Sequence, residues 1–110
     1  MTQQFNARQG DVLITRITEI PKGLREVERD RGRVVLAYGE VTGHAHAIVD
    51  DPVTMFAPAD VDEMTDRFLR VEQEVAVEHE EHDTIKLEPG DYLVRRQREY
   101  APEAPVYVAD

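Results

Sequence analysis

The stretch GRVVLAYGEVTGHAHAIV, residues 32–49, is the most informative part of the sequence for the fold. Apolar and β-branched residues form two short runs, and a glycine-containing segment separates them. Runs of this kind, bounded by turn residues, are typical of β-strands. We therefore predict a strand over residues 32–41 and a second one over residues 44–49, which is either separate or a continuation of the first.

Similar short β-type runs occur along the rest of the chain, with turn residues between them. They cover residues 11–18, 53–56, 67–72, 74–79, 83–88 and 91–99. The acidic segment 58–66 predicts a loop or a single helical turn. Because few segments have helical periodicity, we predict an all-β fold, either a compact small antiparallel β-barrel or a two-sheet roll of six to eight short strands.

The length of 110 residues suits a single domain. We assign residues 1–100 to one β domain and residues 101–110 to an extended C-terminal tail. The N-terminal segment lacks the apolar core of a signal peptide, and no apolar run approaches the roughly 20 residues that span a bilayer. We therefore expect a soluble, cytoplasmic protein that does not cross a membrane.

The overall charge limits the classes of partner. Thirteen Lys and Arg residues against 23 Asp and Glu residues give a net charge of −10, which disfavours binding to nucleic-acid backbones and anionic membranes. The chain has no cysteine, so disulfides and thiolate metal ligands are excluded. The partners that remain are a small anionic ligand and a second copy of the chain in a homodimer.

All four histidines fall in two short motifs, HAH at residues 44–46 and HEEH at residues 79–82. Side chains alternate across a strand, so His44 and His46 share one face if the glycine before them does not change the register. That face also carries the bulky side chains of Leu36, Tyr38 and Ile48. Both histidines are therefore predicted on the inward face.

The second motif lies in the sequence VAVEHEEHD, where Val75 and Val77 define the inward parity. The same parity carries His79 and Glu81 inward. His82 has the opposite parity and joins His79 only if the chain turns between them.

Two histidines separated by one residue on a strand present both imidazoles on one side, close enough to bind one ion. Without sulfur ligands, imidazoles and carboxylates suit zinc, iron, manganese, nickel or copper. We predict one divalent transition metal, bound by His44, His46, His79 and His82.

Glu40 and Glu81 are candidates for an additional ligand or a general base. With an open coordination position, the ion could support a metal-dependent hydrolase acting on a small anionic substrate. The alternative is that the histidine pairs are solvated strand ends.

The segment RRQREY, residues 95–100, offers cations for such a substrate. Arg96, Arg98 and Tyr100 share one parity, and an arginine beside a tyrosine could hold a carboxylate or a phosphate near the metal. The alternative interpretation is that these arginines form ion pairs on an acidic surface.

Two resemblances add to this interpretation. The HAH motif, a distant histidine and the turn LEPGDYLV, residues 87–94, together are similar to the pattern of a cupin. In a cupin the last histidine follows the Pro-Gly turn, whereas here the second histidine pair precedes it. The likeness therefore implies a metal-lined β-barrel in general. The combination of QGDVLI, GEVTGHAHAI, HEEH and VRRQREY also resembles a class of short bacterial and phage proteins, and that likeness implies no activity.

A rival hypothesis is a non-catalytic protein-binding or assembly module of phage or bacterial origin. In such a module the histidines would be structural or would tune binding with pH, and they would lie far apart in space. The interface would include Arg96, Arg98 and Tyr100. A third hypothesis is acid-base catalysis by histidine without a metal.

Overall fold

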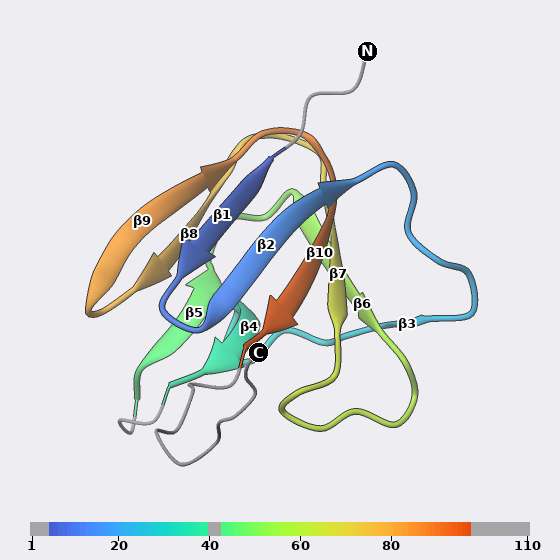
Figure 1. Cartoon of the computed structure of the whole chain (residues 1–110), viewed down its shortest axis with the longest axis horizontal. Coiled ribbons are helices and arrows are strands. Elements are labelled where there is room, and N and C mark those ends of the chain that lie inside the picture. The colour runs from blue at the N-terminus through green and yellow to red at the C-terminus, as the bar shows by residue number, and fades with distance from the viewer. Residues whose placement is uncertain (1–4, 40–42, 98–110) are drawn as a thin grey trace, which may run out of the picture.

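The protein, as a computed structural model, is described over residues 5–39 and 43–97. Within this part of the chain it has ten β-strands and no helix, which confirms the all-β prediction (Figure 1). The strands are β1 (Asn6–Gln9), β2 (Val12–Ile17), β3 (Arg25–Glu26), β4 (Val34–Tyr38), β5 (Ala45–Ile48), β6 (Val53–Ala57), β7 (Arg67–Val71), β8 (Val75–His79), β9 (His82–Leu87) and β10 (Gly90–Arg96).

The strands form two antiparallel sheets. The larger sheet has the order β1-β2-β10-β7-β6-β3, and the smaller has the order β4-β5-β8-β9. The fold is therefore a two-sheet roll and not a closed barrel. The ten strands exceed the predicted six to eight, because β1 and the two-residue β3 lie in polar segments that carry no clear β-type pattern.

The hydrophobic core lies where alternate residues of both sheets face inward. From the larger sheet it includes Val12, Ile14, Met55, Leu69, Tyr92 and Val94, and from the smaller sheet Val34, Leu36, Ile48, Val75, Val77 and Leu87. The buried Tyr92 hydroxyl donates a hydrogen bond to the carbonyl of Glu88 at 2.6 Å, so its polar atom is satisfied. Removal of this apolar surface from water is the main stabilising contribution to the fold.

A β-bulge in β4 changes the predicted alternation. The register of β4 against β5 shifts between Val35 and Ala37, so Ala37 joins the core. The prediction of Tyr38 on the inward face is therefore wrong, and its side chain is 54% exposed. Leu36, within the shift, and Ile48, on β5, are buried as predicted.

The acidic segment 58–66 forms no helical turn. The Asp62 carboxylate accepts hydrogen bonds from the Met64 N–H and the Thr65 hydroxyl, an arrangement that closes a turn instead. No helix among the described residues is long and apolar enough to cross a membrane. The predicted C-terminal tail, residues 101–110, lies outside the described residues.

Candidate metal centre

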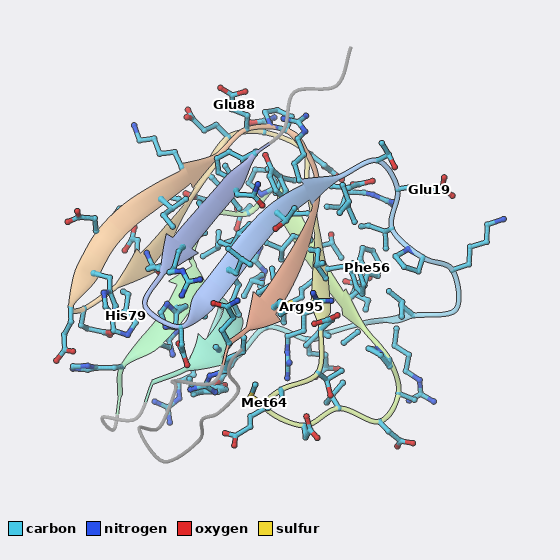
Figure 2. All side chains as sticks on the ribbon, in the orientation of Figure 1. Glu19, Phe56, Met64, His79, Glu88 and Arg95 are labelled. Atoms are coloured by element: carbon cyan, nitrogen blue, oxygen red, sulfur yellow. The ribbon has the colours of Figure 1, made fainter. Side chains whose placement is uncertain are left out.

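The structure brings the four histidines together at one end of the smaller sheet. β5 pairs with β8 through Ala47 and Glu78, and this pairing places the HAH motif beside the HEEH motif. His79 projects from the end of β8, next to the β8–β9 turn (Figure 2). The ring centres lie 5.8 Å apart for His44 and His79, 4.3 Å for His46 and His79, 4.7 Å for His79 and His82, and 6.1 Å for His46 and His82. His79 is thus the common neighbour of the other three.

A tight hairpin explains how His82 joins the group. His79 and His82 are direct partners across the β8–β9 hairpin, and Glu80 and Glu81 form its two-residue turn. Residues that are direct partners in an antiparallel pair have their side chains on the same face of the sheet. His82 therefore lies on the face of His79, although the two would point to opposite faces in a straight strand. The prediction that Glu81 points inward is wrong for the same reason, because it sits in the turn with its side chain 61% exposed. Its Oε2 lies 3.6 Å from Nδ1 of His44.

The spacing of the rings suits a shared ion. Two imidazoles bound to one ion at about 2.1 Å have their ring centres roughly 4.5 to 5.5 Å apart. The observed distances between ring centres run from 4.3 to 6.1 Å, slightly below to slightly above this range. One ligand atom from each of His44, His79 and Glu80 lies within 4.8 Å of the other two, and among the described residues no other group of three His, Asp or Glu meets this condition. Sequence reasoning did not assign Glu80 as a ligand. Main-chain N–H groups of Glu80 itself and of Ala45 hold the pKa of the Glu80 carboxyl below its ordinary value, which keeps it ionised.

His46 is the buried member of the group, with 2% of its surface exposed. Burial, with a further contribution from the nearby His79, lowers the pKa of His46 from 6.5 to about 4, so the ring is neutral at pH 7. Its Nδ1 lies 2.8 Å from Oε1 of Gln9 in the β1–β2 hairpin. Gln9 is also buried, with 2% exposed.

Asp11, in the same hairpin, faces the other ring nitrogen of His46. The distance between Nε2 of His46 and Oδ1 of Asp11 is 3.5 Å. Burial alone would raise the pKa of Asp11, but the hydrogen bond and charge of Arg96 outweigh it and lower that pKa. Arg96 Nε donates to Oδ2 of Asp11 at 2.7 Å, and Arg96 Nη2 donates to the carbonyl of Tyr38 at 3.1 Å.

The β1–β2 turn packs closely on the imidazole rings. Gly10 has φ +61°, and a Cβ at this position would lie 2.8 Å from Nε2 of His82 and 3.3 Å from Cε1 of His46. Only glycine tolerates both this backbone conformation and this approach. The tip of the hairpin, residues 9–11, therefore forms a third side of the site, which sequence reasoning missed. The only signal for it was the sequence QGD, to which no chemistry was attached.

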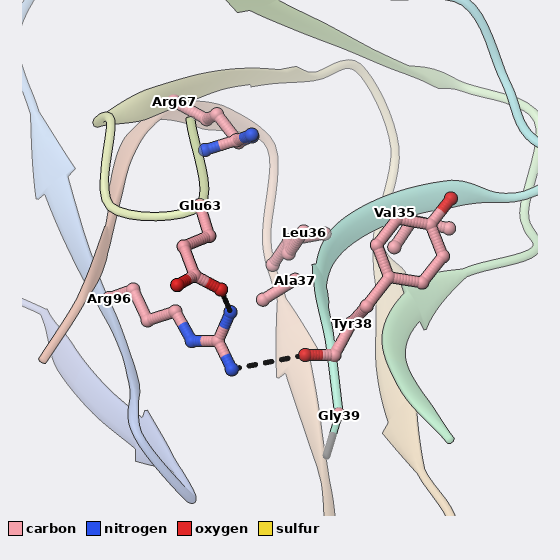
Figure 3. Close-up of a pocket in the computed structure, with 8 residues that line it drawn as sticks. All are labelled: Val35, Leu36, Ala37, Tyr38, Gly39, Glu63, Arg67 and Arg96. Atoms are coloured by element: carbon pink, nitrogen blue, oxygen red, sulfur yellow. Dashed lines mark hydrogen bonds and ion pairs between the residues drawn. The ribbon is translucent and has the colours of Figure 1, made fainter. Parts of the chain in front are cut away.

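The remaining predicted site residues have different positions. Glu40, Arg98 and Tyr100 lie outside the described residues. Arg96 is described, with 16% of its side chain exposed, and its guanidinium contacts Asp11, the Tyr38 carbonyl and, at 3.7 Å, the Glu63 carboxylate. It borders a cavity of about 260 Å³ together with Leu36, Glu63 and Arg67 (Figure 3).

Burial of His46 predicts a pH-dependent stability of the metal-free protein. The unfolded chain takes up a proton near the ordinary pKa of 6.5, whereas folded His46 resists protonation down to about 4. The contribution of His46 to the free energy of unfolding should therefore be complete above about pH 6.5 and fall by ~3 kcal/mol as the pH is lowered to 4. Urea unfolding with a chelator at pH 7.0 and at pH 4.5 measures this loss. A His46→Gln variant should lack most of it, and an equal loss in both proteins would contradict the account.

Comparison with protein-family models matches residues 8–97 to the domain of unknown function DUF8820. The chain belongs to this family. The DUF8820 region extends from within β1 through β10, so it includes Gln9, Asp11 and both histidine motifs. Comparisons with curated proteins and with solved structures gave no match.

Proposed function

We propose that this protein binds one divalent transition-metal ion in its histidine cluster. One observation carries the proposal. The HAH and HEEH motifs contain every histidine of the chain, and the fold brings the two motifs together. The ring centre of His79 lies within 5.8 Å of the ring centre of each other histidine. Clustered imidazoles beside ionised carboxylates are the ligand type that borderline divalent ions prefer. The general likeness of the HAH motif and the Pro-Gly turn to cupins favours the same conclusion.

The ligand chemistry narrows the choice of metal. The chain has no cysteine, so only nitrogen and oxygen ligands are present, and these suit zinc, iron(II), manganese and nickel. Glu80, Glu81 and Asp11 surround the rings and provide negative charge that offsets the charge of a divalent ion.

A hydrogen bond to the ring of His79 limits how this residue can bind an ion. Its Nδ1 accepts a hydrogen bond from the main-chain N–H of Glu81 at 3.0 Å, so the neutral ring carries its proton on Nε2. An ion bound to Nδ1 would displace this hydrogen bond, whereas an ion bound to Nε2 would require the ring proton to move to Nδ1. In either case the ion needs an imidazole lone pair, for which protons compete in acid. We therefore propose that metal uptake is weaker at acidic pH.

A second cavity provides a place for a small anionic ligand. It has a volume of about 230 Å³ and is bordered by Arg33, Glu78, His79 and Glu80, so it opens directly beside the cluster. Among the described residues that border this cavity, Arg33 is the one cation. We propose that it, and not Arg96, would hold a carboxylate or phosphate group next to the ion, because Arg96 is engaged with Asp11 and faces a different cavity. Metal-dependent hydrolysis would require that one coordination position stays open toward this cavity.

The rival assembly module is less well supported. It predicts histidines far apart, whereas the ring centres of the contacting pairs lie 4.3 to 6.1 Å apart. It also predicts an interface that includes Arg96, whose side chain is largely buried against Asp11.

Thermal unfolding of protein without a histidine tag, after treatment with a chelator, tests the proposal. An ion at about 100 times its Kd adds ~2.7 kcal/mol of stability. For a domain of this size that gain raises Tm by roughly 10 °C or more. We expect this rise with at least one of zinc, iron(II), manganese or nickel. No rise with any of the four ions would contradict metal binding.

A further inference from the structure

We infer that Asp11 is a carboxylate ligand of the same metal ion and that Gln9 is the residue that positions His46 to share it. This inference rests on the metal binding proposed above. It adds a side of the site that comes from the β1–β2 hairpin, more than 30 residues away in sequence from either histidine motif.

The orientation of the buried Gln9 side-chain amide is fixed by its neighbours. Gln9 Nε2 donates to the main-chain carbonyl of Val77 at 3.0 Å and to that of Asp83 at 2.8 Å. Rotation of the amide by half a turn would place its oxygen against these two carbonyl oxygens, where no donor is present. Gln9 Oε1 must therefore face His46.

This orientation determines which nitrogen of His46 carries the proton. Because Gln9 Oε1 can only accept, Nδ1 of His46 is the protonated nitrogen and donates to it at 2.8 Å. The neutral ring then has its lone pair on Nε2. Metal-binding histidines are usually held in this way, through a hydrogen bond from the nitrogen that does not bind the ion.

The lone pair of His46 Nε2 points toward a carboxylate. At 3.5 Å from Oδ1 of Asp11, it faces another electron-rich atom across a gap that is too long for a hydrogen bond. With the single proton of the neutral ring on Nδ1, such a pair is repulsive unless a cation lies between the two atoms. Two ligands at about 2.05 Å from a tetrahedral ion are separated by roughly 3.3 to 3.4 Å, which is close to the observed gap.

Arg96 restricts Asp11 to one ligand atom. Its Nε holds Oδ2 of the carboxylate at 2.7 Å, so only Oδ1 faces the ring. Arg96 is itself anchored through the Tyr38 carbonyl. The close approach of Gly10 to the rings of His46 and His82 fixes the hairpin tip that carries Asp11. Oδ1 of Asp11 is thus presented as a single oxygen ligand, as in sites that combine histidines with one carboxylate.

The first experiment measures metal affinity in variants of the complete chain. Asp11→Asn removes the charge of the ligand with little change of shape, and we expect it to weaken binding by about 100-fold. The matched control is Asp66→Asn. Asp66 forms an ion pair with Arg95 at 2.8 Å, as Asp11 does with Arg96 at 2.7 Å, and the two arginines are neighbours in β10. The control should bind within about threefold of the wild type, since surface pairs contribute little.

The second experiment needs no metal, and its deciding measurement is made on the wild type. Nitrogen-15 NMR of the metal-free wild type distinguishes the two neutral tautomers of His46, and we expect the proton on Nδ1. In a Gln9→Leu variant, which has no oxygen to accept the Nδ1 proton, the preference should be lost. A proton on Nε2 in the wild type would overturn the role of Gln9, even if the variant does not fold.

The outcomes separate this inference from the proposed function. If the wild type binds metal and Asp11→Asn binds it equally well, the role of Asp11 is overturned and metal binding by the histidines stands. If the wild type binds none of the ions, both are overturned, while the tautomer of His46 still reports on Gln9 alone.

Discussion

Replacement of His79 by alanine is expected to weaken metal binding by at least 100-fold. His79 is the common neighbour of the other three histidines, with ring centres 4.3 to 5.8 Å away, so an ion shared by the histidines is expected to lie beside it. Even changes to groups that only orient a ligand cost roughly 10- to 100-fold in affinity, and loss of a central ligand should cost more. Titration calorimetry with a competing chelator measures the change.

The matched control for this experiment is Glu78→Gln. Glu78 precedes His79 on β8, but it is exposed and borders the neighbouring cavity. We expect its affinity to stay within about threefold of the wild type, because an exposed carboxylate outside the ligand set contributes mainly screened long-range attraction. Equal affinities of His79→Ala and the wild type would exclude His79 as a ligand.

Substitution of Gly10 by alanine is expected to destabilise the protein by about 3 kcal/mol. An alanine at φ +61° costs ~1 kcal/mol or more in backbone strain. Its Cβ would also lie 2.8 Å from Nε2 of His82, so the ring must move. Displacement of His82 and of the hairpin tip should lower metal affinity as well. Urea unfolding in the presence of a chelator isolates the effect on stability.

Gly32→Ala provides the comparison for this substitution. Gly32 has φ +81°, and a Cβ there would meet no atom within 4 Å, so only the backbone strain remains. We expect a loss of ~1 kcal/mol and unchanged metal affinity. Equal destabilisation by the two substitutions would show that the close approach of the β1–β2 turn to the rings is not tight.

The fold class and the burial of His46 could be predicted from the sequence. Alternation of apolar and polar residues in the stretches around HAH and HEEH is a local property, and it correctly identified strands at both places. The inward parity of Leu36, His46 and Ile48 also holds. These predictions succeeded because each depends only on neighbours along the chain.

The predictions that failed depend on departures from regular strands. The bulge in β4 turns Tyr38 outward, and the two-residue turn after His79 exposes Glu81. A bulge or a turn changes the face of the residues that directly follow it, and composition gives little warning of it. Polar β1 and the short β3 were missed because their pairing comes from the tertiary structure and not from a local pattern.

The contacts made by Gln9 and Asp11 could not be predicted from the sequence at all. Gln9 is 37 residues from His46, and Asp11 is 85 residues from Arg96. Which hairpin tip packs on which ring depends on how the two sheets are arranged. Glu80 was visible in HEEH, but its role as a possible ligand depends on the exact shape of the hairpin turn.

The most direct test of metal binding is a crystal structure with diffraction data collected above and below the absorption edge of the bound ion. The account predicts one anomalous peak in the histidine cluster, at about 2.0 to 2.2 Å from nitrogen atoms of His46 and His79 and from Oδ1 of Asp11. A metal-supplemented crystal with no anomalous peak among the four histidines, or with its only peak elsewhere on the molecule, would contradict it.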